Sequence, residues 1–251
     1  MSVTIKSGKE IEAMRIAGRI TGETLKVIEA AVRPGITTKE LDKLAEEYIL
    51  SCGAKPSFKG YFGYPASICA SVNDRVVHGI PSGQVLKEGD IISVDVGAFI
   101  GGFHGDAART FGVGAISNEN QRLIDVTRQS FFCGIKFAKD GNYLSDISAA
   151  IQDCAESAGF GVVRDYVGHG IGRSMHEDPQ IPNYRNNKRG IKLRAGMTLA
   201  IEPMVNTGTH KVKVLGDGWT AVTKDGGFSA HYENTVLITP DGGEPDILTL
   251  V

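Results

Sequence analysis

The sequence repeats itself at a little under half its length, and this repeat constrains the fold more than any other feature. The same number of residues separates Gly35 from Gly141, Leu41 from Ile147, and Gly53 from Gly159. An offset longer by a single position relates the segment ending at Asp95 to the one ending at Glu202. Such a long repeated unit indicates two pseudo-symmetric halves rather than a solenoid. The symmetry would bring Asp95 and Glu202 to equivalent places.

Capping signals followed by apolar residues at helical spacing predict two helices in each half. In the first half, Ser7 with Glu10 and Thr37 with Glu40 form capping boxes, and Gly53 ends the second helix. In the second half, one helix is expected from Ser117 through Phe131 and another from about Ser145 to Gly159, with a break at Asp140 and Gly141. Helical patterns are common, so their recurrence by chance stays open as the alternative to a duplication.

The composition is that of an ordinary globular protein. With 251 residues, 41% hydrophobic and 22% charged, the chain can bury a large core. We expect a single domain over residues 1–251, with halves at about 1–115 and 116–251. The net charge of −2 supplies neither a basic stripe for nucleic acid nor a polybasic membrane anchor, and no nucleic-acid recognition motif is present.

The start of the chain and its cysteines indicate the compartment. The first residues contain no apolar run long enough for a signal peptide or a membrane span, so a cytoplasmic protein is expected. Cys52, Cys69, Cys133 and Cys154 form no CxxC pair and no zinc-finger spacing. Reduced, scattered thiols are therefore expected, as is usual in the cytoplasm.

Four carboxylates and one histidine lie in short motifs that together suggest a metal site. The five are Asp95 in VDVG, Asp106 in HGDAART, His169 in GHGIG, Glu202 in IEPM, and Glu233 in HYENT. Without cations the four carboxylates would repel one another strongly. This oxygen-rich set suits two divalent ions with shared carboxylates better than a closed structural zinc site. Manganese, iron(II), cobalt and zinc all fit, and the ligands do not choose among them.

The Gly101-Gly102 pair predicts a two-residue hairpin turn between antiparallel strands. With that turn, Gly97 faces Asp106 across the hairpin. Because side chains alternate along a strand, Asp95 then lies on the same face, diagonal to Asp106. Ile92, Val94 and Val96 would point to the opposite, apolar face. A three-residue turn would reverse this parity and separate the two carboxylates.

These motifs, with SVNDRVVHGIP upstream and the run GHGIGRSMHEDPQIPNY, resemble those of the type I methionine aminopeptidases, which are pita-bread metallopeptidases. The resemblance covers essentially the whole chain, in the short bacterial form. It implies an α/β (α+β) fold of two pseudo-symmetric halves, in which an antiparallel sheet encloses a dinuclear metal site and helices lie outside. It also implies removal of the initiator methionine from nascent proteins when the second residue is small, with a transient ribosome contact and a monomeric chain.

The resemblance implies a role for each residue of the site. Asp95 ligates one metal, His169 and Glu202 ligate the other, and Asp106 and Glu233 bridge both. A metal-bound hydroxide is the nucleophile, and Glu202 also accepts and shuttles the proton. His78 and His176 match the two histidines that face the substrate.

A methionine side chain calls for aromatic and polarizable pocket walls. By the resemblance, the substrate-binding residues are Tyr61, Tyr64, Cys69 and Trp219, together with Met175. The related bacterial enzymes usually carry Phe where this chain has Met175, and Phe58 takes a place often held by a smaller residue. We therefore expect methionine to be preferred and norleucine to be tolerated somewhat better.

Other interpretations of these motifs are weaker. A single aspartate or histidine is usually structural or exposed, and His104, His210 and His231 are placed in that class, with His231 the least certain because it adjoins Glu233. GHGIG lacks the nucleotide-binding spacing GxGxxG, and no GxSxG motif indicates a serine hydrolase. Two rival functions stay open: an X-Pro-specific pita-bread peptidase, and a non-catalytic homologue that binds nascent chains or ribosomes.

Overall fold

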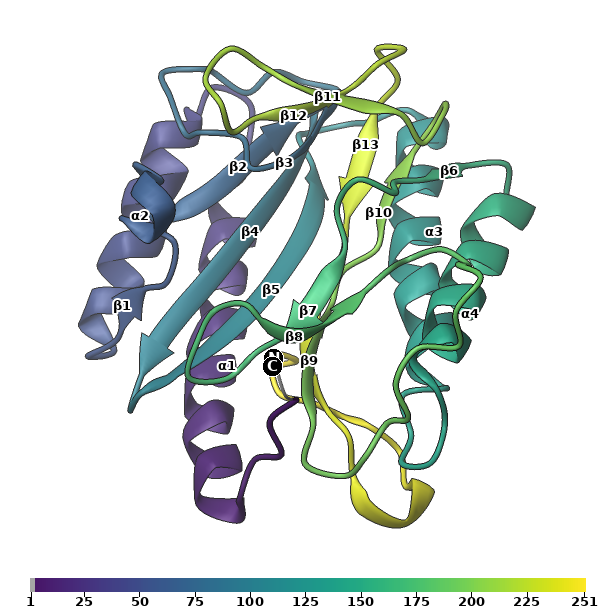
Figure 1. Ribbon diagram of the computed structural model, residues 1–251. Helices are drawn as coiled ribbons and strands as arrows, with labels where there is room; N and C mark the ends of the chain where they lie inside the picture. The colour runs from purple at the N-terminus through teal and green to yellow at the C-terminus, as the bar shows by residue number, and fades with distance from the viewer. Residues whose placement is uncertain (1–2) are drawn as a thin grey trace.

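The computed structural model describes residues 3–251, and its elements fall into two successive sets (Figure 1). The first set is α1 (Gly8–Ala31), α2 (Thr38–Ser51), β1 (Lys55–Pro56), the 3-10 turn η1 (Tyr61–Gly63), β2 (Ile68–Val72), β3 (Arg75–Val77), β4 (Ile91–Ile100) and β5 (Phe103–Gly112). The second is α3 (Asn118–Ile135), α4 (Leu144–Ser157), β6 (Gly161–Val162), β7 (Gly168–Gly170), β8 (Glu177–Ile181), β9 (Thr198–Ile201), β10 (Met204–Asn206), β11 (Val212–Val214), β12 (Ala221–Thr223), β13 (Ser229–His231), β14 (Asn234–Leu237), the turn η2 (Pro240–Gly242) and β15 (Asp246–Ile247).

The helices begin and end close to where the sequence predicts. Capping boxes at Ser7 and Thr37 start α1 and α2, and the side chain of Ser117 caps α3. The hydroxyls of Thr37 and Ser117 accept from backbone N–H groups of the first helical turn, and the backbone N–H of Ser7 donates to the carboxylate of Glu10. The four predicted helices are therefore confirmed, with α4 starting just before the expected position.

The repeat is also visible in the order of the elements. α2 corresponds to α4 and β1 to β6, because the same number of residues separates the first residues of the two members of each pair. β4 corresponds to β9 in the same way, with a separation that is one residue longer. The offsets read from the sequence therefore relate real elements, which confirms the expectation of two similar halves. The domain count and the division near residue 115 stay predictions.

Each helical pair covers its own set of antiparallel strands (Figure 1). β4 pairs with β1, β2 and β5, and its apolar residues Ile92, Val94 and Val96 are fully buried in one core with residues of α1 and α2. In the other half, the strand order is β15-β14-β9-β7-β8, and α3 and α4 bury their apolar faces against β9 and β14. The apolar face predicted for β4 is confirmed.

Close backbone contacts hold α1 against β5, the strand that carries Asp106. An added Cβ at Gly105 in β5 would lie 2.7 Å from the backbone nitrogen of Gly18 in α1. An added Cβ at Gly18 would in turn lie 2.4 Å from the carbonyl oxygen of Leu248. Glycine at position 105 lets α1 approach the hairpin, and glycine at position 18 lets the chain at Leu248 approach α1.

All four cysteines are free, in agreement with the expected reduced thiols. Cys133 and Cys154, however, lie side by side rather than scattered. Within residues 3–251, none of the helices combines the length and apolar character needed to cross a membrane.

Candidate active site

The β4–β5 hairpin turns at Gly101 and Gly102, which both have positive φ, as a two-residue turn requires. Gly97 faces Asp106 across the hairpin, as predicted. Asp95 therefore lies on the same face as Asp106, diagonal to it. The geometric prediction for the first two carboxylates is confirmed.

Glu233 joins this face through the backbone of Ala108. Its N–H donates to the carbonyl of Ala108 at 3.0 Å and its carbonyl accepts from the N–H of Ala108 at 3.3 Å. Ala108 is also the direct partner of Asp95 in β4. The backbones of Asp95 in β4, Ala108 in β5 and Glu233 between β13 and β14 thus form one row, which brings a carboxylate from the C-terminal half to the hairpin.

Thr235 fixes the position of Asp106 in the same way. Its hydroxyl accepts from the N–H of Asp106 and donates to the carbonyl of Asp106, both at 3.0 Å. Arg109, the next charged residue of β5, donates to the carbonyl of Glu233 and to Asn234 Oδ1. These contacts tie the two halves together directly behind the carboxylates.

His169 and Glu202 come from β7 and from the residue that follows β9. The Nε2 atom of His169 lies 3.6 Å from Asp106 Oδ2 and 3.6 Å from Glu202 Oε1. Its Nδ1 atom lies 2.9 Å from the carbonyl oxygen of Gly170, a contact that requires a proton on Nδ1. Nε2 is then unprotonated and faces the carboxylates as a lone-pair donor.

Burial together with mutual repulsion disfavours the charged forms of these acids. It raises the pKa of Asp95, Glu202 and Glu233 well above their usual range, with Asp106 the largest charged contributor after burial in each case. Burial raises the pKa of Asp106 to about 7 and lowers the pKa of His169 to about 4. Four crowded carboxyls and a neutral imidazole are the arrangement that a bound cation would stabilise.

Buried polar atoms in this cluster support the same interpretation. Oδ1 of Asp95, Oδ1 of Asp106 and Oε1 of Glu233 accept no hydrogen bond from any residue between 3 and 251. Unpaired buried oxygens are destabilising unless another partner meets them. Ligand atoms of Asp106, His169 and Glu233 lie within 4.8 Å of one another, which is close enough to hold a metal ion. The residues present therefore fit divalent metal binding.

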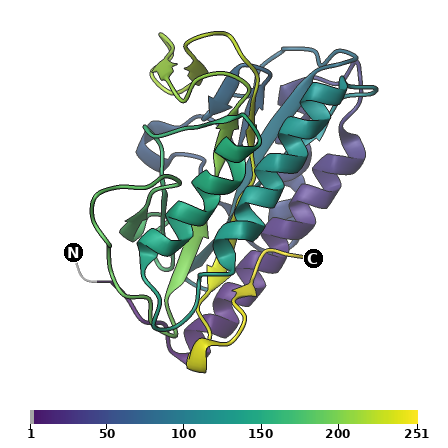
Figure 2. The ribbon, with the colours of Figure 1, turned by 90° about the vertical axis from the view of Figure 1, so that its right-hand side faces the viewer.

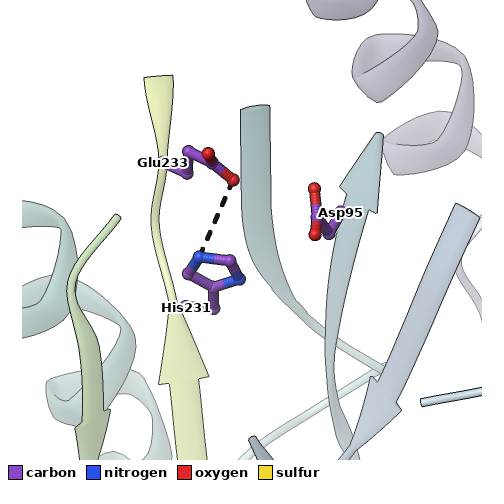
Figure 3. Close-up of side chains that lie close together, drawn as sticks. All are labelled: Asp95, His231 and Glu233. Atoms are coloured by element: carbon purple, nitrogen blue, oxygen red, sulfur yellow. Dashed lines mark ion pairs between the residues drawn. The ribbon is translucent and has the colours of Figure 1, made fainter. Parts of the chain in front are cut away.

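His231 belongs to this cluster, although the sequence analysis placed it outside the site. Figure 3 shows His231 and Glu233 projecting from one segment toward Asp95 on β4. The Nε2 atom of His231 lies 3.6 Å from Glu202 Oε2 and 3.8 Å from Glu233 Oε2, and has no hydrogen-bond partner among the described residues. Ligand atoms of Asp95, His231 and Glu233 also lie within 4.8 Å of one another. The alternation of strand side chains, which puts residues 231 and 233 on one face, could have indicated this.

A cavity of about 500 Å³ opens in front of the carboxylates. All twelve residues that the sequence analysis assigned to the site line it, and they are His78, Asp95, Asp106, His169, His176, Glu202, Glu233, Tyr61, Tyr64, Cys69, Met175 and Trp219. Phe58 lines it as well. Phe62, Val77, Tyr166 and Val167 line it too and were missed, because none of them lies in a motif with recognisable chemistry.

The two histidines without a metal role face the cavity from opposite halves. The ring of His176 lies tilted against that of His169 with centroids 4.2 Å apart, and its Nδ1 lies 2.8 Å from the hydroxyl of Tyr61. His78 has a positive φ of 59° and packs edge-on against Tyr166. Burial lowers the pKa of both histidines to about 4, so both are neutral at pH 7.

The apolar end of the cavity is built from aromatic and sulfur side chains. Met175 is 2% exposed and packs in one cluster with Phe58, Tyr64 and Cys69. Trp219 packs edge-on against Tyr64, whose hydroxyl lies 3.0 Å from the carbonyl oxygens of both Ile68 and Gly79. Cys69 is the direct neighbour of Asp95 in the sheet, so the apolar end adjoins the carboxylates.

The remaining histidines lie away from the cavity lining. The Nδ1 atom of His104 lies 2.9 Å from the hydroxyl of Ser57, and its ring packs against Phe99. Neither His104 nor His210 is among the described residues that line the cavity. That both are structural or exposed stays a prediction.

Known proteins with similar sequences are metallopeptidases. The sequence model of metallopeptidase family M24 matches residues 12–240. The curated methionine aminopeptidase of Clostridium perfringens is 59% identical, with 99% of each chain covered. Methionine aminopeptidase 1 of Bacillus subtilis is 52% identical, with 99% of this chain and all of the relative covered.

Solved structures have the same fold. The crystal structure of methionine aminopeptidase from Thermotoga maritima superposes with a TM-score of 0.97 at 49% identity over the full length of both chains. The prolidase from Pyrococcus furiosus has a TM-score of 0.79 at 24% identity, and the match covers 98% of this chain and 65% of the prolidase. That second likeness concerns the fold alone. The expected α/β pita-bread fold, with antiparallel strands and outer helices, is confirmed.

Proposed function

The chain belongs to metallopeptidase family M24, and on this premise we propose how its cavity removes methionine from the N-terminus of a peptide. The activity is that of its relatives, since curated proteins 45–59% identical over nearly the whole chain are methionine aminopeptidases. One observation supports this proposal most strongly. Five side chains of the types that bind metals, two neutral histidines and a set of apolar side chains all line the same cavity.

We assign the metal-binding roles to five residues. Asp95 would hold one divalent ion, His169 and Glu202 would hold a second, and Asp106 and Glu233 would bridge the pair. The short distances among these side chains and their unpaired buried oxygens support the assignment. When bound, divalent ions lower the pKa of water and polarise a carbonyl.

Glu202 is assigned to proton transfer. Its Oε1 and Oε2 atoms face His169 and His231 at 3.6 Å, so the carboxylate is held from both sides. Burial and the nearby Asp106 and Asp95 raise its pKa, which favours taking up a proton near neutral pH. It can therefore accept the proton of attacking water and pass it to the leaving amine.

His176 and His78 are assigned to substrate orientation. The hydroxyl of Tyr61 is 2.8 Å from Nδ1 of His176. When that hydroxyl donates, the proton of the neutral ring sits on Nε2, which can then donate to a peptide carbonyl. His78, from the other half, can meet the scissile amide. Positioning of this kind lowers the barrier without a covalent step.

The apolar end of the cavity fits the side chain of the first residue. The polarizable sulfurs of Met175 and Cys69 and the rings of Tyr64 and Trp219 suit an unbranched thioether. Placement of this end beside Asp95 would put the first peptide bond over the carboxylates. We propose that the preference is for peptides with a small second residue, and that nascent proteins are the natural substrates.

Three further features of the proposal rest on the natural substrate rather than on the site. They are action in the cytoplasm, a transient ribosome contact and a monomeric chain. Sedimentation with purified ribosomes would test the second, and light scattering would test the third.

The two rival functions have less support. Solved structures of a prolidase, an Xaa-Pro dipeptidase and an X-Pro aminopeptidase with the same fold are 23–24% identical to this chain, whereas the methionine aminopeptidase of Clostridium perfringens is 59% identical. A non-catalytic homologue would have no need for a complete ligand set and both histidines, all of which line the cavity here.

The test is release of free methionine from Met-Ala-Ser and Met-Pro peptides. The protein would be stripped of metal with a chelator and assayed with and without added manganese or cobalt. Metal-dependent release from Met-Ala-Ser is the expected result. Absence of release with every metal from a protein that is folded by circular dichroism would reject the proposal in favour of the binding homologue. Faster cleavage of Met-Pro than of Met-Ala-Ser would favour an X-Pro enzyme.

A further inference from the structure

Two cysteines far from the cavity meet between the helices of the second half. Cys133 lies near the end of α3 and Cys154 near the end of α4, and their sulfur atoms are 3.1 Å apart. Figure 2 shows the two helices side by side on the outside of the molecule. The segment between the two cysteines includes the whole α3–α4 connection.

Gly134 explains why the two helices come so close at this point. A Cβ at this position would lie 2.6 Å from Cγ1 of Ile151 and 3.4 Å from Cγ2 of Ile147, both in α4. Gly134 is the neighbour of Cys133 in α3, and Ile151 lies three positions before Cys154, which places it beside Cys154 on the helix. The close helix contact is therefore directly beside the sulfur pair.

The distance between the sulfurs suits bond formation. A disulfide bond is about 2.05 Å long, so the two atoms need to move together by only about 1 Å. Both side chains are half-buried, and they border a groove of about 500 Å³ between the helices whose lining includes Gln129, Asp153 and Ser157. A small reagent can reach the sulfurs from this groove without any opening of the core.

We propose that Cys133 and Cys154 form a redox-modifiable dithiol that small disulfide compounds convert to an intramolecular disulfide. The thiolate of one cysteine attacks one sulfur of the reagent, forms a mixed disulfide and releases one reagent thiolate. The sulfur of the other cysteine then attacks the cysteine sulfur of the mixed disulfide, and its proton leaves with the second reagent thiol. The two cysteines are oxidised by two electrons, and the reagent disulfide is reduced to two thiols.

Burial, and after it the neighbouring Cys133, raises the pKa of Cys154 to about 12. The thiolate is the attacking form of cysteine, so an alkaline pH favours the first step whichever sulfur takes it.

The bond would clamp α3 to α4 without entering the cavity. The inner side of α3 packs against β13 and β10, and the sulfur pair lies on its outer side toward α4. Closing the loop between the two cysteines restricts the unfolded chain. We therefore expect oxidation to raise the melting temperature, by roughly 5 °C or more for a chain of this size.

The experiment treats the full-length, metal-loaded protein with cystamine, a small disulfide, at pH 8. Intact mass, thiol titration in denaturant and peptide mapping are the readouts. The expected product has lost two hydrogens, retains two of the four thiols, carries a Cys133–Cys154 cross-link and melts at a higher temperature. Cys154→Ser should stop at a single cystamine adduct on Cys133, and Cys52→Ser should oxidise as the parent does.

Several results would overturn the proposal. One is a folded parent protein that keeps all four thiols under cystamine. Others are separate adducts on both cysteines, a cross-link between two chains, or a Cys133–Cys154 bond that leaves the melting temperature unchanged. The parent protein supplies these results by itself, so the test does not depend on the folding of either variant.

Discussion

Asp106→Asn is expected to stabilise the metal-free protein while it destroys metal binding. Asp106 is 3% exposed, lies among three other carboxyls, and one of its oxygens has no hydrogen-bond partner within residues 3–251. Asparagine has nearly the same shape, carries no charge, and can donate to the neighbouring carboxyl groups of Asp95 and Glu233. The substitution therefore removes a buried negative charge and leaves the packing unchanged.

The expected gain in the free energy of unfolding follows from the pKa of Asp106, which burial raises from 3.8 to about 7 in the folded protein. Above pH 7 the folded state must ionise this carboxyl, which destabilises it by about 4 kcal/mol relative to an unfolded chain. As the pH falls from 7 toward 3.8, the folded carboxyl holds a proton that the unfolded one has lost. The penalty then shrinks by about 1.4 kcal/mol per pH unit.

The assay is urea unfolding of both chelator-treated proteins at pH 8 and pH 6, followed by circular dichroism. The variant should be more stable at pH 8 by up to about 4 kcal/mol, with a smaller advantage at pH 6. The two proteins must be compared at each pH because buried histidines also make stability depend on pH. The pKa of His169, for example, is lowered to about 4, so the folded state loses stability as the pH decreases through 6.5 toward 4. Their contribution is common to both proteins.

Saturating manganese should reverse the order, because only the parent retains both bridging carboxylates. Asp125→Asn, on the exposed side of α3, is the control and should leave stability nearly unchanged at both pH values. A metal-free Asp106→Asn protein that is less stable than the parent at pH 8 would refute the idea that the buried charge of Asp106 destabilises the metal-free fold.

Three further predictions concern packing, metal binding and specificity. Gly105→Ala places a methyl group 2.7 Å from the backbone of Gly18 and should destabilise the protein by about 1–3 kcal/mol in urea unfolding. Gly8→Ala is the control, because its methyl group meets no atom within 4 Å and should leave the stability unchanged. Equal stability of the two variants would contradict the close contact between α1 and β5. His231→Ala should weaken manganese binding by about 10–100-fold in calorimetry, because the imidazole faces two assigned ligands, and unchanged affinity would place His231 outside the metal cluster. Met175→Phe should raise the ratio of kcat/KM for methionine over norleucine peptides, and an unchanged ratio would remove the reason given for relaxed specificity.

Much of the site could be predicted because it depends on local rules. The turn at Gly101 and Gly102 sets the register of the hairpin, and strand alternation then puts Asp95 and Asp106 on one face. Capping boxes likewise mark the starts of α1 and α2, because each box involves only residues a few positions apart in the chain. The motifs and the family resemblance identified twelve residues of the cavity lining, whose individual roles stay proposals, but missed Phe62, Val77, Tyr166 and Val167.

Other contacts depend on which strands and helices meet, and no local rule sets this. Glu233 reaches the hairpin through Ala108, which belongs to the other half of the chain, and Thr235 holds Asp106 from a similar separation. The pairing of Cys133 with Cys154 depends on the close approach of two helices at Gly134. The sequence by itself determined the helices, the hairpin register and the types of ligand, because neighbouring residues decide these through backbone geometry. Only the tertiary structure decided that Glu233 and Thr235 reach the hairpin and that two thiols meet, because long-range packing brings those groups together.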